Sequence, residues 1–210
     1  MPFPGKPQAA LYFSKASLCL DGDYANTLSR AHAEANFLDV PVGFVTDRMI
    51  RAGKLSRLRL LIVPDAEFVD PDVRAAIERF AKDGGRVLLT QESLRRSPDP
   101  GKPLRQQDAP GMERVDSLDR TTLARAIGEA GIAPAIQIAS PDTHQVECRS
   151  VPVDGKTVFY LLALGKPPET VRLTSAGRPL GAWTDLVTGT KGTSSEFTLA
   201  PLEFRMIQLD

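Results

Sequence analysis

Up to Gly131, the chain alternates short apolar runs with amphipathic segments. The apolar runs at 9–14, 41–46, 58–63 and 86–90 have the length of buried strands. Helical spacing of three and four positions follows the first run, in Tyr24, Leu28, Ala31, Ala35 and Leu38. This spacing predicts a helix over 24–38, with Asp23 as its cap. Further helices are predicted from Asp70-Pro71 to Gly84-Gly85 and over 119–130.

Strands that alternate with helices need crossover connections, so this part predicts a parallel sheet with helices on both faces. After Pro134 the apolar period changes to two. Strand-length runs are expected at 145–151, 157–163, 169–174, 180–187, 195–199 and 203–209, separated by Asp-Gly and Gly-rich turns. The pattern therefore predicts an α/β domain over 1–133 and a small antiparallel β-sandwich over 134–210. A proline-rich segment at about 95–112 is expected to form an exposed, partly disordered loop.

Composition narrows the classes of function. The 210 residues include 26 Lys and Arg against 26 Asp and Glu, and this balance argues against nucleic acid as a partner. The longest strongly apolar run, 60–63, is far too short to cross a membrane. The N-terminus lacks the apolar core of a signal peptide, and two distant cysteines indicate a reducing compartment. A cytoplasmic protein is therefore expected.

Ligands bind such parallel sheets at the carboxyl ends of their strands. The polar side chains predicted at or near that edge, and expected to bind a ligand, are Ser14, Ser17, Asp47, Gln91 and Glu92. Their alternative role is to cap helices and to form turns. Carboxylates suit a divalent cation, and the candidates are Asp21, Asp23, Asp65 and Glu67. Helix capping and loop solvation account for the same residues, and no other cofactor is expected.

The sharpest catalytic hypothesis pairs Cys19 with His32, and Asp65 is a further catalytic candidate. A cysteine at the N-terminal end of a helix can act as a nucleophile, and a histidine can act as its general base. The alternative is a buried, inert thiol and a histidine packed at a helix edge. Two surface hypotheses remain. A basic cluster in the proline-rich loop either contacts an anion or an acidic partner or forms a solvated loop: Arg95, Arg96, Lys102 and Arg105. Aromatic residues of the β domain form either a sugar-stacking platform or core: Phe159, Tyr160, Trp183 and Phe197.

Several stretches resemble the part of family 42 β-galactosidases that follows the catalytic barrel. In the first part they are Leu11-Tyr-Phe-Ser14, Pro41-Val-Gly-Phe-Val45 and Leu60-Leu-Ile-Val-Pro64. These resemble the glutamine-amidotransferase-like domain, which that family uses for trimerisation. The second part is similar to the small β domain that closes the same enzymes, in Val158-Phe-Tyr-Leu-Leu162 and Trp183 through Asp185-Leu186-Val-Thr-Gly189.

The resemblance implies a flavodoxin-like, class I glutamine-amidotransferase-like fold and a homo-oligomer, with a homotrimer favoured. A catalytic barrel of about 250 residues is longer than this chain, so the two glutamates that such a barrel carries are absent. The glutaminase cysteine is also missing, because the corresponding turn reads Val63-Pro-Asp65-Ala-Glu67.

These observations predict a non-catalytic accessory and oligomerisation module, which a separate catalytic barrel chain can accompany. Two alternatives stay open. One is a stand-alone ester or phosphoester hydrolase with its site at the carboxyl edge of the sheet, and the other is a carbohydrate-binding module. The sequence therefore does not decide whether the chain is an enzyme.

Overall fold

The computed structural model describes residues 7–104, 107–139 and 144–210, and the chain divides into two compact units. The first, which we call the α/β unit, comprises Pro7–Glu34 and Pro41–Ile132. The second, which we call the β unit, contains Ala35–Val40 and Ala133–Asp210. A single boundary near residue 133 does not fully separate the two units, because the short segment Ala35–Val40 from the first half of the sequence belongs to the β unit.

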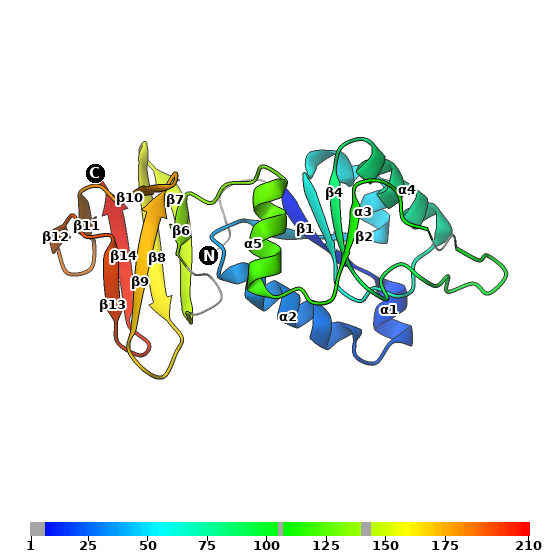
Figure 1. The fold of residues 1–210 in the computed structure, drawn as a ribbon, viewed down its shortest axis with the longest axis horizontal. Helices are drawn as coiled ribbons and strands as arrows, with labels where there is room; N and C mark the ends of the chain where they lie inside the picture. The colour runs from blue at the N-terminus through cyan, green and yellow to red at the C-terminus, as the bar shows by residue number, and fades with distance from the viewer. Residues whose placement is uncertain (1–6, 105–106, 140–143) are drawn as a thin grey trace. The chain divides into compact units, whose positions relative to one another are not determined.

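A five-stranded parallel sheet forms the centre of the α/β unit (Figure 1). Its order, β2-β1-β3-β4-β5, is the flavodoxin-like order, in which the winding reverses between β1 and β3. The strands are β1 (Ala9–Phe13), β2 (Val42–Thr46), β3 (Leu60–Val63), β4 (Arg86–Thr90) and β5 (Met112–Val115). The predicted α/β class is confirmed, but β5 falls where the sequence predicts the end of a loop. Its four residues are all half-buried at the sheet edge, so they lack a strong apolar pattern.

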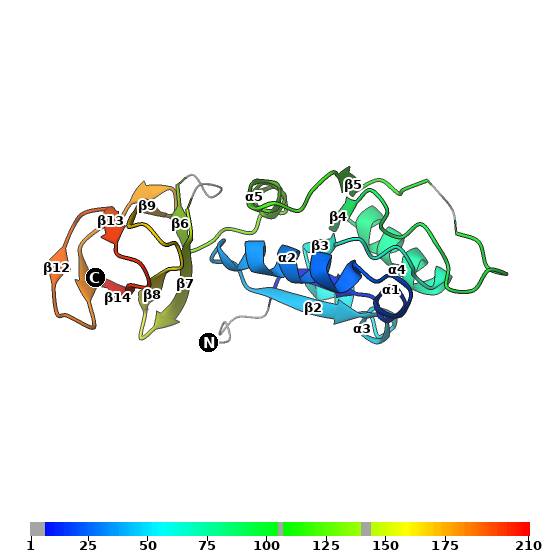
Figure 2. The ribbon, with the colours of Figure 1, turned by 90° about the horizontal axis from the view of Figure 1, so that it is seen from below.

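Helices cover both faces of this sheet, as predicted (Figures 1 and 2). The helices are α1 (Lys15–Leu20), α2 (Tyr24–Asn36), α3 (Asp47–Arg51), the 3-10 helix η1 (Lys54–Arg57), α4 (Pro71–Lys82) and α5 (Arg120–Glu129). Arg120 of α5 lies 3.0 Å from Glu34 of α2, whereas Arg51 of α3 pairs with Asp72 of α4. None of the helices in the described ranges is long and apolar enough to cross a lipid bilayer.

The proline-rich segment is anchored more firmly than its composition predicts. The Arg74 side chain is only 3% exposed, and it donates hydrogen bonds to the carbonyls of Leu94 and Gln107. Arg114 binds the Asp108 carboxylate with two nitrogens, at 2.6 and 3.0 Å. The two arginines therefore fix both ends of the segment, while 99–103 is exposed. Residues 105–106 lie outside the described residues.

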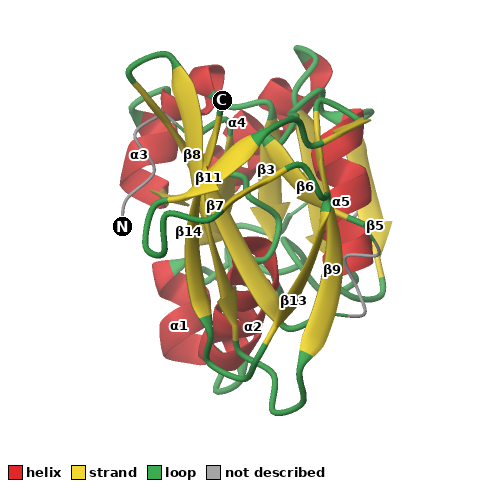
Figure 3. Cartoon of the chain, turned by 90° about the vertical axis from the view of Figure 1, so that its left-hand side faces the viewer, coloured by secondary structure: helices red, strands yellow, loops and turns green. Residues whose placement is uncertain are grey.

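The β unit consists of two antiparallel sheets, which form the predicted sandwich (Figure 3). One sheet has the order β12-β11-β14-β8-β7, and in the other β9 pairs with β10, β13 and β6. The strands are β6 (Ile136–Ile138), β7 (Val146–Val153), β8 (Lys156–Ala163), β9 (Glu169–Ser175), β10 (Arg178–Pro179), β11 (Trp183–Asp185), β12 (Lys191–Gly192), β13 (Glu196–Leu199) and β14 (Phe204–Leu209). The predicted runs correspond to β7, β8, β9, β11, β13 and β14, although the run at 180–187 is reduced to the three residues of β11. The short strands β6, β10 and β12 are not predicted by the sequence.

A buried carboxylate joins the two sheets of the β unit. Asp39 is 4% exposed, and its oxygens accept from the backbone N–H of Ile136 in β6 at 2.9 Å and of Ser150 in β7 at 2.6 Å. The Ser150 hydroxyl donates a third bond at 2.7 Å. Burial raises the pKa of Asp39, and these three hydrogen bonds oppose the rise. Asp39 thus satisfies buried donors that belong to two different sheets.

Candidate functional site

The predicted ligand-binding position lies where the winding reverses, between the carboxyl ends of β1 and β3. Ser14 and Ser17 lie there, but both are completely buried. The Ser14 hydroxyl caps α1 by accepting from the Ser17 N–H at 3.0 Å, and it donates to the Phe68 carbonyl at 2.7 Å. The Ser17 hydroxyl accepts from the Phe68 N–H at 2.9 Å. Backbone of the same chain therefore holds the two serines that the sequence assigns to a ligand.

A second loop closes the same edge of the sheet. The backbone N–H of Leu94 donates to the carbonyl of Ala66 at 2.9 Å, and that of Arg96 donates to the carbonyl of Glu67 at 3.0 Å. The Arg96 carbonyl in turn accepts from the N–H of Val69 at 2.9 Å. The loops after β3 and after β4 are thus hydrogen-bonded to each other across the edge. We call them the edge loops, 64–69 and 91–96.

Asp65 begins the first edge loop in a backbone conformation that favours glycine, with φ of 44°. Its N–H donates to the Thr90 hydroxyl at 2.8 Å, and the neighbouring Ser93 hydroxyl donates to the Val63 carbonyl at 2.7 Å. Aspartate tolerates the left-handed region better than most residues, because its short side chain can hydrogen-bond locally. The described contacts of this residue are structural, and they hold the two edge loops in place.

The remaining predicted ligand-binding residues do not gather at one point. Asp47 begins α3 and accepts a hydrogen bond from the buried Tyr12 hydroxyl. Burial, followed by this bond to a carboxylate, raises the pKa of Tyr12 well above its usual value. Gln91 is exposed and donates to the Asp116 carboxylate at 3.0 Å, and Glu92 is exposed beside it. Each of these side chains has a separate environment.

The acidic residues proposed for a divalent cation are also not brought together. Throughout the described ranges, the structure contains no group of three or more His, Cys, Asp or Glu side chains placed to hold a metal. Asp21 accepts from the Asp23 N–H at 3.0 Å, and Asp23 accepts from the side-chain amide of Asn26 at 3.0 Å. Glu67 pairs with Arg96 at 2.8 Å. Local turns and ion pairs, together with Asp65 in its edge loop, account for all four.

Cys19 and His32 lie on different helices. Cys19 is exposed in the last turn of α1, not at the N-terminal end of a helix as expected. The positive end of the helix dipole, which would favour a thiolate, is therefore at the opposite end of α1. His32 lies on α2, where its ring packs against Phe44 with a centroid distance of 5.2 Å. The physical argument for an activated nucleophile does not hold here.

The two surface hypotheses have mixed outcomes. Of the aromatic residues, Phe159, Trp183 and Phe197 belong to the buried core of the β unit, so they cannot form a platform. Tyr160 is half-buried and lies 5.8 Å from the ring of Phe204. In the basic cluster, Arg96 pairs with Glu67, Lys102 lies 3.2 Å from Asp99, and Arg95 donates to the Gln91 carbonyl. Arg105 lies outside the described residues.

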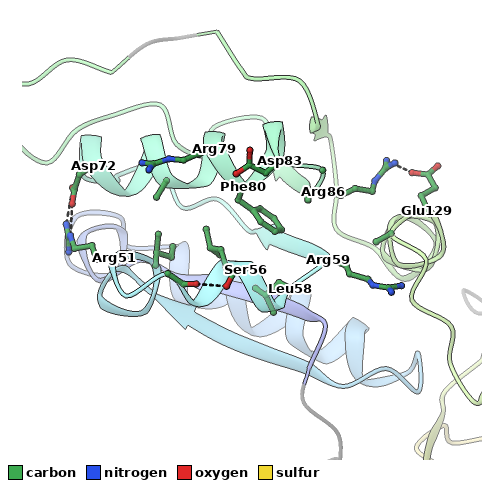
Figure 4. Close-up of a pocket in the computed structure, with 17 residues that line it drawn as sticks. Arg51, Ser56, Leu58, Arg59, Asp72, Arg79, Phe80, Asp83, Arg86 and Glu129 are labelled. Carbon is green, nitrogen blue, oxygen red and sulfur yellow. Dashed lines mark hydrogen bonds and ion pairs between the residues drawn. The ribbon is translucent and has the colours of Figure 1, made fainter.

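A cavity of the α/β unit lies at the other end of the sheet. It is a groove of about 880 Å³ between α4 and the α3–η1 segment, beside the amino ends of β3 and β4 (Figure 4). Its apolar lining consists of Ile50, Leu55, Leu58, Ala76, Phe80 and Ala130. The Phe80 ring points from α4 into the groove (Figure 4). A Cβ at Gly85 would clash with this ring, so a larger residue at that position would force the ring to move.

Ion pairs stand at the two ends of this groove (Figure 4). Arg51 donates to Asp72 at 2.7 Å at one end, and Arg86 pairs with Glu129 at the other. The hydrogen bonds that Arg51 donates to the carboxylates of Asp72 and Asp70 raise its pKa further above the ordinary value. An apolar floor with a charged rim is typical of protein interfaces. The groove could not be predicted from the sequence, because α3 and η1 are too short to show helical periodicity.

Comparisons with known proteins identify the fold. No family model matches the chain, and no curated protein matches it. Among solved structures, an exo-carrageenase of GH42 from Bacteroides ovatus superposes over 98% of this chain and 29% of its own, with a TM-score of 0.77 and 19% identity. A β-galactosidase from Rahnella sp. R3 covers 97% of this chain and 41% of its own, with a TM-score of 0.68 and 14% identity.

A rhamnosidase from Novosphingobium sp. PP1Y has the same fold over 97% of this chain and 22% of its own, with a TM-score of 0.56 and 10% identity. The chain thus spans well under half the length of these glycoside hydrolases. At such identities the similarity establishes the fold alone. The protein has the two-unit fold, α/β followed by β, that GH42 enzymes contain as one part of a longer chain.

Proposed function

We propose that the protein is a non-catalytic accessory module related to the C-terminal part of GH42-type glycoside hydrolases, and that it joins subunits. The observation that carries this proposal is the share of each chain that the structural superpositions cover. Almost all of this chain corresponds to a part of those enzymes that makes up 29% of one and 41% of another. As proposed, the α/β unit is of the glutamine-amidotransferase-like trimerisation type, and three copies are the assembly that the resemblance implies.

Two further observations support an accessory role. The similar structures are named for different activities, a carrageenase, a β-galactosidase and a rhamnosidase. A part that recurs in all three is a poor candidate for recognising one sugar. The edge loops also occupy the carboxyl edge of the sheet, where flavodoxin-like folds bind ligands. The catalytic barrel of such an enzyme would then belong to a separate chain.

Two measurements on the purified chain test the proposal. Light scattering after gel filtration should give a multiple of the 22.8 kDa chain mass, whereas a monomer at every concentration would argue strongly against an oligomerisation role. Chromogenic galactosides and esters should show no turnover. Turnover that is lost on Asp65→Ala or Cys19→Ala would instead support the hydrolase alternative, while activity retained in both variants would indicate a contaminant or another site.

A further inference from the structure

One face of α4 is exposed and carries residues at helical interface spacing. Asp72, Ala75, Ala76 and Arg79 follow one another at i, i+3, i+4 and i+7, which places them on a single stripe. Ala75 and Arg79 are exposed, and Ala76 is half-buried at the edge of the groove. Two alanines at the centre of a stripe allow another helix to approach closely, at an interaxial distance of about 8 Å.

The charges of this stripe are separated along the helix. At its N-terminal end, Asp70 and Asp72 share the single cation Arg51, which leaves an excess negative charge. At the other end, Arg79 forms no ion pair within the part of the chain that the structure describes. Within the stripe, Asp72 is negative and Arg79 is positive, so an antiparallel second copy would place each of these side chains opposite a side chain of the other sign. A surface with this polarity complements itself about a two-fold axis.

We propose that α4 and the adjoining groove form an isologous interface between two copies of this chain. The two-fold axis passes between Ala75 and Ala76, so the α4 helices pack antiparallel. In this arrangement Arg79 of each copy reaches Asp72 of the other, and the paired alanines form the closest contact. The antiparallel helix dipoles add a favourable interaction.

The groove continues this contact surface. Asp72, Ala76 and Arg79 belong to the stripe and also line the groove. The second copy of α4 would consequently lie along the mouth of the groove and cover its apolar floor, including the Phe80 ring. This arrangement gives a buried apolar centre with ion pairs at the rim, as in other protein interfaces.

The inference rests on the proposed oligomerisation role, but it names a separate contact. An isologous contact joins copies in pairs and cannot by itself close a ring of three. Alone it produces a dimer, and together with a three-fold contact it produces a hexamer. The stoichiometry therefore distinguishes this inference from the function on which it rests.

Sedimentation velocity and light scattering, from micromolar to hundreds of micromolar chain, test the contact. The variants are Ala75→Trp, which blocks the close approach, and Arg79→Glu, which places like charges opposite each other. Arg178→Glu is the control variant, because it makes the same charge change as Arg79→Glu at an exposed site of the β unit. The double variant Asp72→Lys/Arg79→Glu reverses the polarity and leaves Asp70 to pair with Arg51. Circular dichroism and the single tryptophan, Trp183, confirm that each variant folds.

The expected result is a dimer or hexamer. Both Ala75→Trp and Arg79→Glu should weaken its two-fold dissociation constant about tenfold or more, the double variant should restore it, and Arg178→Glu should not change it. A trimer, or any assembly that the stripe variants leave unchanged, would overturn the interface and leave the oligomerisation role standing. A monomer throughout, in wild type as in the variants, would overturn both.

Discussion

The carboxylate of Asp39 offers the most direct test of how the β unit is held together. Replacing it with alanine removes the acceptor for two backbone N–H groups and one hydroxyl, all buried. An unmade hydrogen bond of this kind costs about 1 kcal/mol or more. Asp39 also has a φ of 43°, in which alanine is strained by about 1 kcal/mol. We expect Asp39→Ala to lower the free energy of unfolding by about 4 kcal/mol.

Further variants separate the contributions of backbone strain and of hydrogen bonding at Asp39 to the free energy of unfolding. Asp39→Gly relieves the strain and should lose about 3 kcal/mol, while Asp39→Asn keeps one acceptor and should lose about 1–2 kcal/mol. Asp154 is the matched control, because it has a φ of 49° but is exposed. Asp154→Ala should cost only about 1 kcal/mol. Urea unfolding followed by Trp183 fluorescence reports on the β unit itself. If Asp39→Ala costs no more than Asp154→Ala, water satisfies the donors and the reasoning fails.

The pH dependence of the same residue has a definite sign. Burial raises the pKa of Asp39 in the folded state above its unfolded value of about 3.9. The folded protein therefore binds this proton more tightly, and the resulting stabilisation is complete below the unfolded pKa and is lost as pH rises through the folded pKa. Asparagine does not titrate. The stability of the wild type relative to Asp39→Asn should decrease from about pH 4 towards neutrality, and an increase would contradict the assignment.

Three further outcomes are expected. Arg74→Ala leaves the buried carbonyl of Leu94 and the half-buried carboxylates of Glu78 and Asp108 without their cation. Urea unfolding followed by helical circular dichroism should therefore show a loss of about 3 kcal/mol, and limited proteolysis should cut the 94–108 segment faster; unchanged cleavage would refute the anchoring role. Gly85→Ala should destabilise by about 1–3 kcal/mol through its clash in the groove, whereas Gly128→Ala, with open space around it in α5, should stabilise by about 0.5–1 kcal/mol in the same assay. A thiol reagent should label the exposed Cys19 in the native protein and reach Cys148 only after unfolding, because burial raises the pKa of Cys148 and excludes the reagent; two native thiols would contradict this.

Long, regular elements could be predicted from the sequence. The strand at 86–90 has the predicted bounds, and the Asp70-Pro71 and Gly84-Gly85 signals delimit α4 within a residue or two. The short elements α1, α3 and η1 could not, since one or two turns are too few to show a period. The sequence does not predict the strand Met112–Val115, because its four residues are all half-buried and show no apolar alternation.

The candidate site could be predicted only in part. Ser14 and Ser17 do lie at the carboxyl edge of the sheet, where strand order places them, yet their partner is the backbone of Phe68. Hydrogen bonds between segments more than 50 positions apart determine which loop covers that edge. Local sequence patterns do not predict contacts at such separations. The stripe Asp72, Ala75, Arg79 is visible in the sequence, but only the structure shows the groove that lies beside it.

The assignment of Ala35–Val40 has a practical consequence for dissecting the protein. No single cut in the polypeptide separates the two halves cleanly, because a peptide that starts near position 134 lacks the aspartate that anchors β6 and β7. Such a truncated product would keep all the strands of the β unit, but three buried hydrogen-bond donors would be left without their acceptor, Asp39. Deletion studies on this architecture should therefore carry the 35–40 segment along, for example by circular permutation, before a failure to fold is attributed to the β strands themselves.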